Sequence, residues 1–328
     1  MATPPVAGVR GLVAAASMAP SMHNAQPWLF EFAAADGLLD LRADPARTMP
    51  VTDPRGRGTR LSCGAALFTL RVAAAYYGWR ADHVLLPEPD DPGLLARVCL
   101  TRAPGRASPD GRLFPAIARR RTSREPFSER PVPDDLRQAL VDAAGTEGAR
   151  LLFPDPWHVE SVLDLVDEAE QKQHADPRAR AELARWTRLT EKSLAAQDGV
   201  PSYALGPSRR YGRAPVRDFA DGAAVPGRGR AEFERFPQIA LLGTSGDSAR
   251  DWLVAGQALG RVLLEATSRG LATSLTSQAL EWRELRRFAR DPRSTMGAVH
   301  MVLRLGYGPS GPPTPRRPVE TILTVRAR

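Results

Sequence analysis

The segments SCGAALFTLRVAAAYYGWRA (residues 62–81) and VAGQALGRVLLEATSRGLAT (residues 254–273) decide how this chain is organised. Small and apolar residues fall on the same positions in both, at a constant offset: Gly64 and Gly256, Ala66 and Ala258, Leu67 and Leu259. Apolar residues recur at intervals of three and four residues in each segment, and a glycine follows each run, which is typical of helices. The match predicts two related helices whose small residues allow close packing.

A second, weaker match pairs residues 9–16 with residues 137–144, in the same order along the chain. Two matches in the same order favour an internal duplication more strongly than either match does alone. We therefore predict two related halves that form a pseudo-dimer within one chain. The first, reduced half is residues 1–112, and the second is residues 113–328.

The remaining pattern alternates helix and strand and predicts an α+β fold. Helices are expected at residues 9–18, 62–77, 134–143, 157–173, 178–194, 251–269 and 281–289. Strands are expected at residues 28–32, 38–42, 83–86, 96–101, 238–243 and 299–305, the first two as a hairpin around Asp36-Gly37. Residues 103–111 are expected to form a linker, and the proline-rich tail is expected to wrap away from the core.

Bulk properties narrow the function classes. The hydrophobic content of 43% suffices for a sizeable core. No run of apolar residues approaches the length of a membrane span. Because residues 1–8 do not resemble a secretory signal, we expect a cytoplasmic protein. The net charge of +8 does not indicate nucleic acid, because the arginines are dispersed. Cys63 and Cys99 are expected to be small buried residues, and five scattered histidines form no metal set.

Three stretches have residue types suited to a ligand. The loop at residues 20–28, PSMHNAQPW, offers short polar groups that could hydrogen-bond the edge of a planar heterocycle, or it is a helix-capping turn before a core tryptophan. Residues 119–124, RRRTSR, suit a phosphate monoester, or they are a basic linker. Residues 315–318, PRRP, hold two arginines between prolines and suit binding, or they are a basic tail.

Taken together, these motifs resemble the nitroreductase superfamily. The order of PSxxNxQPW, RRTxR before Pro-Val-Pro, and a closing RxGYG with PRRP resembles the actinobacterial Acg-type branch, in which one chain carries two nitroreductase-like halves. The resemblance covers nearly the whole chain. It implies a mixed sheet flanked by helices, with FMN held at the interface between the halves. An extra residue between Arg124 and Phe127 and the sequence Val299-His300-Met301 depart from the family pattern.

By this resemblance, Ser21, Asn24 and Gln26 would contact the isoalloxazine ring. Positively charged and hydroxyl groups would face the phosphate or ribityl chain: Arg120, Arg121, Thr122, Arg124 and Arg317, with Arg316 as a further candidate or a residue of the tail alone. Residues 270–274, and among them Gly270, Thr273 and Ser274, would lie near the flavin N5 edge.

The resemblance implies an FMN-dependent oxidoreductase in which NADH or NADPH reduces the flavin and a small organic acceptor reoxidises it. The flavin performs the redox step, so no catalytic acid, base or nucleophile is required. The alternative is a protein that sequesters FMN under a lid and has little reductase activity.

The irregular stretch at residues 198–229 is the candidate lid, expected to cover the flavin through Tyr203, Tyr211 or Phe219. Each chain is expected to keep one FMN site, because only the first half has the PSxxNxQPW loop and only the second has the RRTxR arginines. Since one chain supplies both sides of that site, a monomer would suffice to bind FMN.

Overall fold

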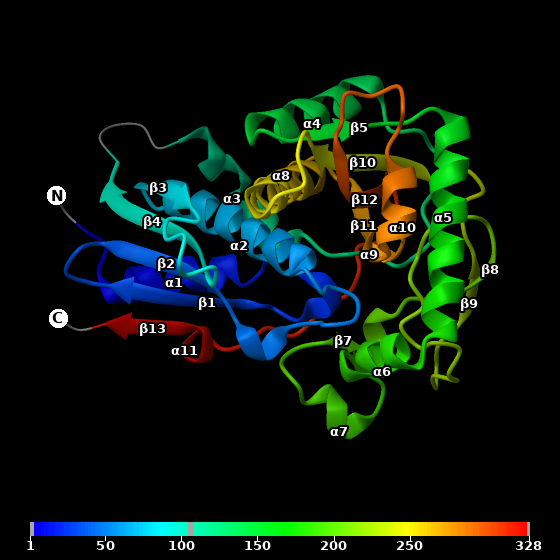
Figure 1. The fold of residues 1–328 in the computed structure, drawn as a ribbon, viewed down its shortest axis with the longest axis horizontal. Coiled ribbons are helices and arrows are strands. Elements are labelled where there is room, and N and C mark those ends of the chain that lie inside the picture. The colour runs from blue at the N-terminus through cyan, green and yellow to red at the C-terminus, as the bar shows by residue number, and fades with distance from the viewer. Residues whose placement is uncertain (1–2, 104–107, 327–328) are drawn as a thin grey trace.

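Two long helices lie at the centre of the fold, with a sheet packed on each (Figure 1). The computed structural model describes residues 3–103 and 108–326. Helix α2, Arg57–Tyr76, packs on a five-stranded sheet, and helix α8, Ala249–Ser268, packs on a four-stranded sheet. The fold is α+β, as predicted, and the predicted pairing of these two helices is confirmed.

The helices α2 and α8 approach closely where both carry glycine. A Cβ atom added to Gly64 would lie 2.3 Å from the Leu253 carbonyl oxygen, and one added to Gly256 would lie 2.3 Å from the Leu61 carbonyl oxygen. The two contacts exchange residues that match in the sequence repeat, Leu61 with Leu253 and Gly64 with Gly256. Such reciprocity is the geometry that a local two-fold axis produces.

The five-stranded sheet is mixed and has the order β13-β1-β2-β4-β3. Its strands are β1 Trp28–Ala33, β2 Leu38–Ala43, β3 Trp79–Leu85, β4 Leu94–Arg102 and β13 Leu323–Arg326. The predicted hairpin forms between β1 and β2, and Gly37 adopts the left-handed φ of +68° that its turn requires. The sheet and α2 share one apolar core.

The four-stranded sheet is antiparallel and has the order β11-β12-β10-β5. Its strands are β5 Arg150–Leu152, β10 Gln238–Thr244, β11 Ala272–Thr276 and β12 Ala298–Gly306. The sequence reading did not identify β5 or β11 as strands. Other helices cover the two layers: α1 Val6–Ala16, α3 Phe114–Arg119, α4 Asp134–Thr146 and α5 Pro156–Ala175.

The single helix predicted at residues 178–194 is wrong. The chain forms α6 Pro177–Arg185, the short strand β6 Thr187–Arg188 and then α7 Glu191–Leu194. Helix α6 ends where Trp186 turns into a small apolar cluster. A new helix starts at Thr190, whose hydroxyl caps it in a reciprocal pair with Ser193.

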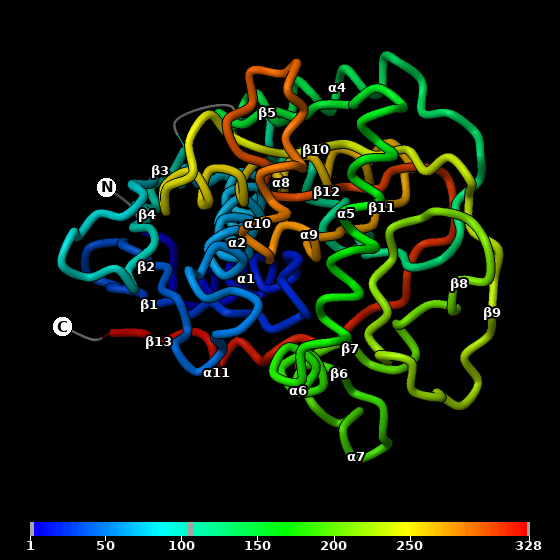
Figure 2. Tube along the Cα trace, turned by 45° about the vertical axis from the view of Figure 1, so that its right-hand side comes forward, coloured from blue at the N-terminus to red at the C-terminus, as the bar shows by residue number. Residues whose placement is uncertain are grey.

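Two further predictions are corrected near the C-terminus. The helix expected at residues 281–289 is three short turns, α9 Gln278–Glu281, α10 Arg283–Arg286 and η5 Arg287–Ala289, because Trp282 is extended. The tail does not wrap away. It crosses to the first sheet through α11 Val319–Ile322 and adds β13 parallel to β1 (Figure 2), where Ile322 and Leu323 join the apolar core.

The candidate lid contains little regular structure. Its elements are β7 Val200–Pro201, η4 Ser202–Ala204 and β8 Ser208–Tyr211, and β8 pairs with β9 Arg230–Glu232. The predicted linker lies partly outside the described residues, and its end forms the turn η3 Pro109–Leu113. None of the helices in the described ranges is long and apolar enough to cross a membrane.

Candidate functional site

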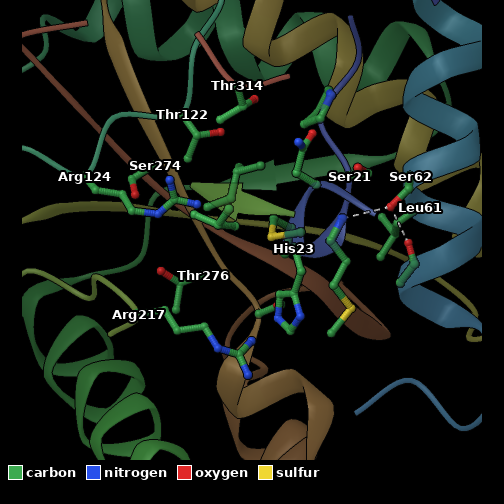
Figure 3. Close-up of a pocket in the computed structure, with 18 of the residues that line it drawn as sticks. Ser21, His23, Leu61, Ser62, Thr122, Arg124, Arg217, Ser274, Thr276 and Thr314 are labelled. Carbon is green, nitrogen blue, oxygen red and sulfur yellow. Dashed lines mark hydrogen bonds between the residues drawn. The ribbon is translucent and has the colours of Figure 1, made fainter. Parts of the chain in front are cut away.

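A cavity lies where the loop at residues 20–24 meets the N-terminal end of α2, the segment at residues 120–124 and the candidate lid (Figure 3). Strand β11 and the tail near Arg316 complete the wall. The cavity draws its wall from both sequence halves.

The loop of residues 20–28 has an unusual backbone. Three residues other than glycine, His23, Asn24 and Gln26, have left-handed φ angles of +50°, +55° and +53°. Such angles cost free energy for most side chains and concentrate at functional sites. Two serine hydroxyl groups help to hold the loop: the backbone N–H of Gln26 donates to Ser21 Oγ at 3.0 Å, and that of Met22 donates to Ser62 Oγ at 3.2 Å.

Asn24 joins three separate segments at the edge of the cavity. Its Nδ2 donates to the carbonyl oxygens of Gly199 at 2.9 Å and Pro315 at 3.1 Å, and its Oδ1 accepts from Arg316 Nη1 at 3.0 Å. The side-chain amide therefore fixes the start of the candidate lid and aims an arginine of the tail. Both polar atoms of the side chain have protein partners in this structure.

Three arginines at one end of the cavity have no carboxylate partner among the described residues: Arg120, Arg121 and Arg316. Arg120 is 4% exposed, and both its Nη1 and the Nε of Arg316 are buried without a hydrogen-bond acceptor. Burial and the neighbouring guanidinium groups lower the pKa of Arg120 to about 9 and that of Arg316 to about 10. Their mutual repulsion would be relieved by an anion bound between them.

A second group of cations lies toward the candidate lid. Arg124 donates to the Ala204 carbonyl oxygen at 2.8 Å, and its guanidinium carbon lies 4.8 Å from the Phe219 ring centroid. Burial and the charge of Arg217 lower the pKa of Arg124 to about 10. Arg217 is paired with Glu281 at 2.7 Å. No carboxylate contributes to the cavity wall in the described parts of the chain.

His23 projects toward Arg217 of this second group (Figure 3). Its ring lies edge-on to Phe219 at a centroid distance of 5.4 Å. Neither ring nitrogen has a hydrogen-bond partner, although the residue is only 6% exposed. Burial lowers the pKa of His23 well below its usual value, and the charges of Arg217 and Arg124 lower it further. The imidazole is therefore neutral near pH 7 and presents one N–H donor.

The structure brings most of the sequence-predicted residues to the cavity wall: Ser21, Asn24, Arg120, Arg121, Thr122, Arg124, Ser274 and Arg316. Four lie outside it. Gln26 is buried and accepts a hydrogen bond from the Arg317 amide, and Arg317 pairs with Asp44 at 3.0 Å. Thr273 is buried beside the segment of residues 121–123, and Gly270 is an exposed residue after α8.

Sequence reasoning missed several residues of the wall: His23, Arg57, Ser62, Arg217, Thr276 and Thr314. His23 lay inside the quoted loop, and its flanking polar residues were the available signal. Of the candidate lid's three aromatic residues, Phe219 reaches the cavity, whereas Tyr203 and Tyr211 are 57% and 60% exposed. Of the three alternatives, Phe219 is therefore the residue placed to cover the cavity, and η4 and β8 leave the two tyrosines at the surface.

Comparison with known proteins agrees with the motifs. The profile described as “Nitroreductase family” matches residues 117–307. Two Mycobacterium tuberculosis relatives, each named a “Putative NAD(P)H nitroreductase”, are 30% identical over 98% of this chain and 96% of the relative, and 33% identical over 96% and 90%. A solved structure described as “a putative nitroreductase” from Anabaena variabilis is 12% identical, with a TM-score of 0.49 over 93% of this chain and 90% of that one.

The family profile covers more than half of the chain, and the mycobacterial relatives, one of them named acg, align over nearly all of it. The chain therefore belongs to the nitroreductase family and is Acg-like.

Proposed function

We propose that the cavity binds FMN and that the protein is an FMN-dependent oxidoreductase using NADH or NADPH. The observation that carries the proposal is the group of three arginines without carboxylate partners, Arg120, Arg121 and Arg316, in a cavity whose described wall has no acidic residue. A phosphate monoester is a compact anion with several acceptor oxygens, which matches converging guanidinium donors. The names of the relatives support the redox role.

The described residues fit FMN at both ends of the molecule. The buried, unpartnered Nη1 of Arg120 and Nε of Arg316 are donors that await acceptors, and the hydroxyl groups of Thr122 and Thr314 stand in the same wall. The wall also has apolar side chains that suit a flat ring: Leu61, Val216, Phe219, Leu259 and Met301. Arg124 lies over the ring of Phe219, and its positive charge would face the polar edge of the flavin.

FMN, when bound, would accept a hydride from NADH or NADPH and pass electrons to a small organic acceptor. The protein's own part is to hold, orient and shield that group. The arginines of residues 120–121 and 316 would fix the phosphate, Ser21 and Ser274 would offer hydroxyl groups to the ring, and Phe219 would exclude water. The positive charge of Arg124 would stabilise negative charge on the reduced ring.

Arg120→Ala tests the phosphate site, with Arg119→Ala as a matched control because Arg119 is exposed and adjacent. We expect Arg120→Ala to weaken FMN binding by about 10- to 100-fold, since each charge-assisted hydrogen bond contributes about 1.5–3 kcal/mol. Arg119→Ala should bind FMN like the wild type. Equal affinity for all three proteins, measured by flavin fluorescence, would contradict the proposal.

An anaerobic titration with NADH and then NADPH tests the redox role. We expect the absorbance of bound FMN to bleach, followed by reoxidation on addition of a nitroaromatic or quinone. FMN that binds tightly but stays oxidised under excess of both donors would favour the sequestering alternative instead.

We also propose that residues 1–112 and 113–328 descend from one duplicated unit. The reciprocal glycine contacts between α2 and α8 support this origin. The packing does not follow the sequence boundary between the halves completely, because residues 319–326 belong to the second half but pack with the first. The cytoplasmic location and the small-molecule nature of the partners stay predictions.

A further inference from the structure

One part of the cavity has hydrogen-bond donors other than the three arginines proposed to bind the phosphate. We define the His23 subsite as Phe219 and the three residues packed around its ring at the lid side of the cavity: His23, Arg124 and Arg217. Figure 3 shows the His23 ring and the Arg217 guanidinium side by side, His23 coming from the loop before β1 and Arg217 from the candidate lid.

Two independent groups in this subsite are buried and unsatisfied. Both ring nitrogens of His23 and the Nε of Arg217 have no partner among the described residues, although the two residues are 6% exposed each. A buried donor without an acceptor is costly, and such groups are nearly always satisfied by protein, water or ligand. The protein holds the His23 backbone in a left-handed conformation while leaving its ring nitrogens unpartnered.

Glu281 does not satisfy these donors. It accepts from Nη1 of Arg217 at 2.7 Å and from Nη2 at 3.1 Å, and it accepts from Ser277 Oγ at 2.8 Å, so its oxygens are already engaged. Gln173 takes a second bond from Arg217 Nη2. The Nε of Arg217 stays free, and the nearby Arg124 adds positive charge without an acidic partner. The subsite therefore combines an imidazole N–H, a guanidinium N–H and uncompensated positive charge.

From this convergence we propose that the His23 subsite binds the second substrate and selects one that carries an oxyanion, most simply an aromatic carboxylate with a reducible group. His23 and Arg217 donate to the carboxylate, and Phe219 packs against the ring. The inference rests on the proposed FMN function and adds the substrate class to it. It assigns His23 a substrate-binding role and involves no covalent step.

A pair of probes of equal shape tests the charge preference: 4-nitrobenzoate, an anion, and 4-nitrobenzamide, its neutral counterpart. Binding is measured by calorimetry on oxidised, FMN-loaded protein without any electron donor, so no turnover is required. We expect the wild type to bind the anion at least about tenfold more tightly, since hydrogen bonds to charged groups are worth about 1.5–3 kcal/mol. Equal affinity for the two probes would overturn the oxyanion class.

Two substitutions locate the preference at His23. His23→Phe keeps a ring against Phe219 but removes the N–H, and we expect it to reduce the preference for 4-nitrobenzoate by about tenfold. His23→Asn restores a donor and tolerates a left-handed backbone, so it should recover part of the preference. His83→Phe, on β3 and outside the cavity wall, is the control and should behave like the wild type.

FMN affinity, measured separately by fluorescence titration, separates this inference from the function on which it rests. If His23→Phe weakens FMN and leaves the probe preference intact, the flavin is the occupant of the subsite and the inference fails. If the wild-type protein does not bind FMN, the proposed function fails, and probe binding to the flavin-free protein still decides whether His23 binds an oxyanion. An unchanged preference in both His23 variants also overturns it.

Discussion

At the scale of single residues, the site is marked by groups that the folded chain leaves unsatisfied. Arg120 is buried with one donated bond, from Nη2 to the Met18 carbonyl oxygen at 3.2 Å, and with two other arginines nearby. Such an arrangement is unfavourable without a ligand, because a buried charge needs a partner. Removing the Arg120 guanidinium should therefore weaken FMN binding and stabilise the flavin-free protein.

Arg120→Met keeps most of the side-chain volume and removes the charge. We expect this variant to raise the unfolding free energy of the flavin-free protein by about 1–3 kcal/mol, the usual cost of an unsatisfied buried group. The same variant should lose most of the increase in melting temperature that added FMN gives the wild type. Thermal unfolding with and without FMN checks both, and a destabilised flavin-free variant would show that Arg120 is a structural residue.

Single residues also differ in whether their place in the site could be predicted from the sequence. Ser21, Arg120 and Arg316 could be predicted as wall residues from motifs, because short polar groups and paired arginines point to a phosphorylated ligand. Gln26 and Arg317 could not be excluded in the same way. Whether a side chain faces the cavity depends on left-handed backbone angles such as the +53° of Gln26, which the residue type does not specify.

At the scale of elements, long periodic segments were predictable and short ones were not. Helices α2, α5 and α8 have apolar repeats over 20 residues each, so their existence follows from the sequence. Strand β5 has three residues, and α9 and α10 have four each, so tertiary contacts rather than local pattern decide them. The return of β13 to β1 is a long-range pairing that no local pattern records.

The close contact of α2 and α8 yields a stability prediction. Gly64→Ala places a methyl group against the Leu253 carbonyl oxygen, and Gly256→Ala places one against that of Leu61. Because backbone must move, we expect each to destabilise the protein by about 1–3 kcal/mol or more. Gly11→Ala in α1, which meets nothing within 4 Å, should stabilise by up to about 1 kcal/mol. Chemical denaturation compares the three, and a neutral Gly64→Ala would refute the close packing.

Of the three aromatic residues named in the candidate lid, Phe219 is the one that lines the cavity. Phe219 is 7% exposed and packs on His23 and Arg124. We expect Phe219→Ala to open the cavity and to speed the reduction of bound FMN by dithionite several-fold. Tyr203→Ala, at an exposed position of the same segment, is the control. Stopped-flow absorbance gives both rates, and equal rates in the two variants would show that residues 198–229 form a surface loop only.

At the scale of the whole molecule, two helices in reciprocal contact lie beside a single cavity. The close contacts between α2 and α8 are reciprocal. In contrast, the loop of residues 20–28 and the arginines of residues 120–124 each occur once, and both contribute to one cavity. After α4, where a second such loop would follow, the chain reads Glu147-Gly148-Ala149 and enters β5. The related helices could be predicted from the sequence, whereas the cavity's assembly required the fold.

The central claim is that one chain forms one complete FMN site from parts of both halves. The most direct measurement is the amount of flavin released per polypeptide after denaturation of protein saturated with FMN, with the oligomeric state determined in parallel. We predict one FMN per chain, retained by a monomer. A ratio near two would reveal a second site that the account does not contain, and the absence of bound flavin would contradict the account altogether.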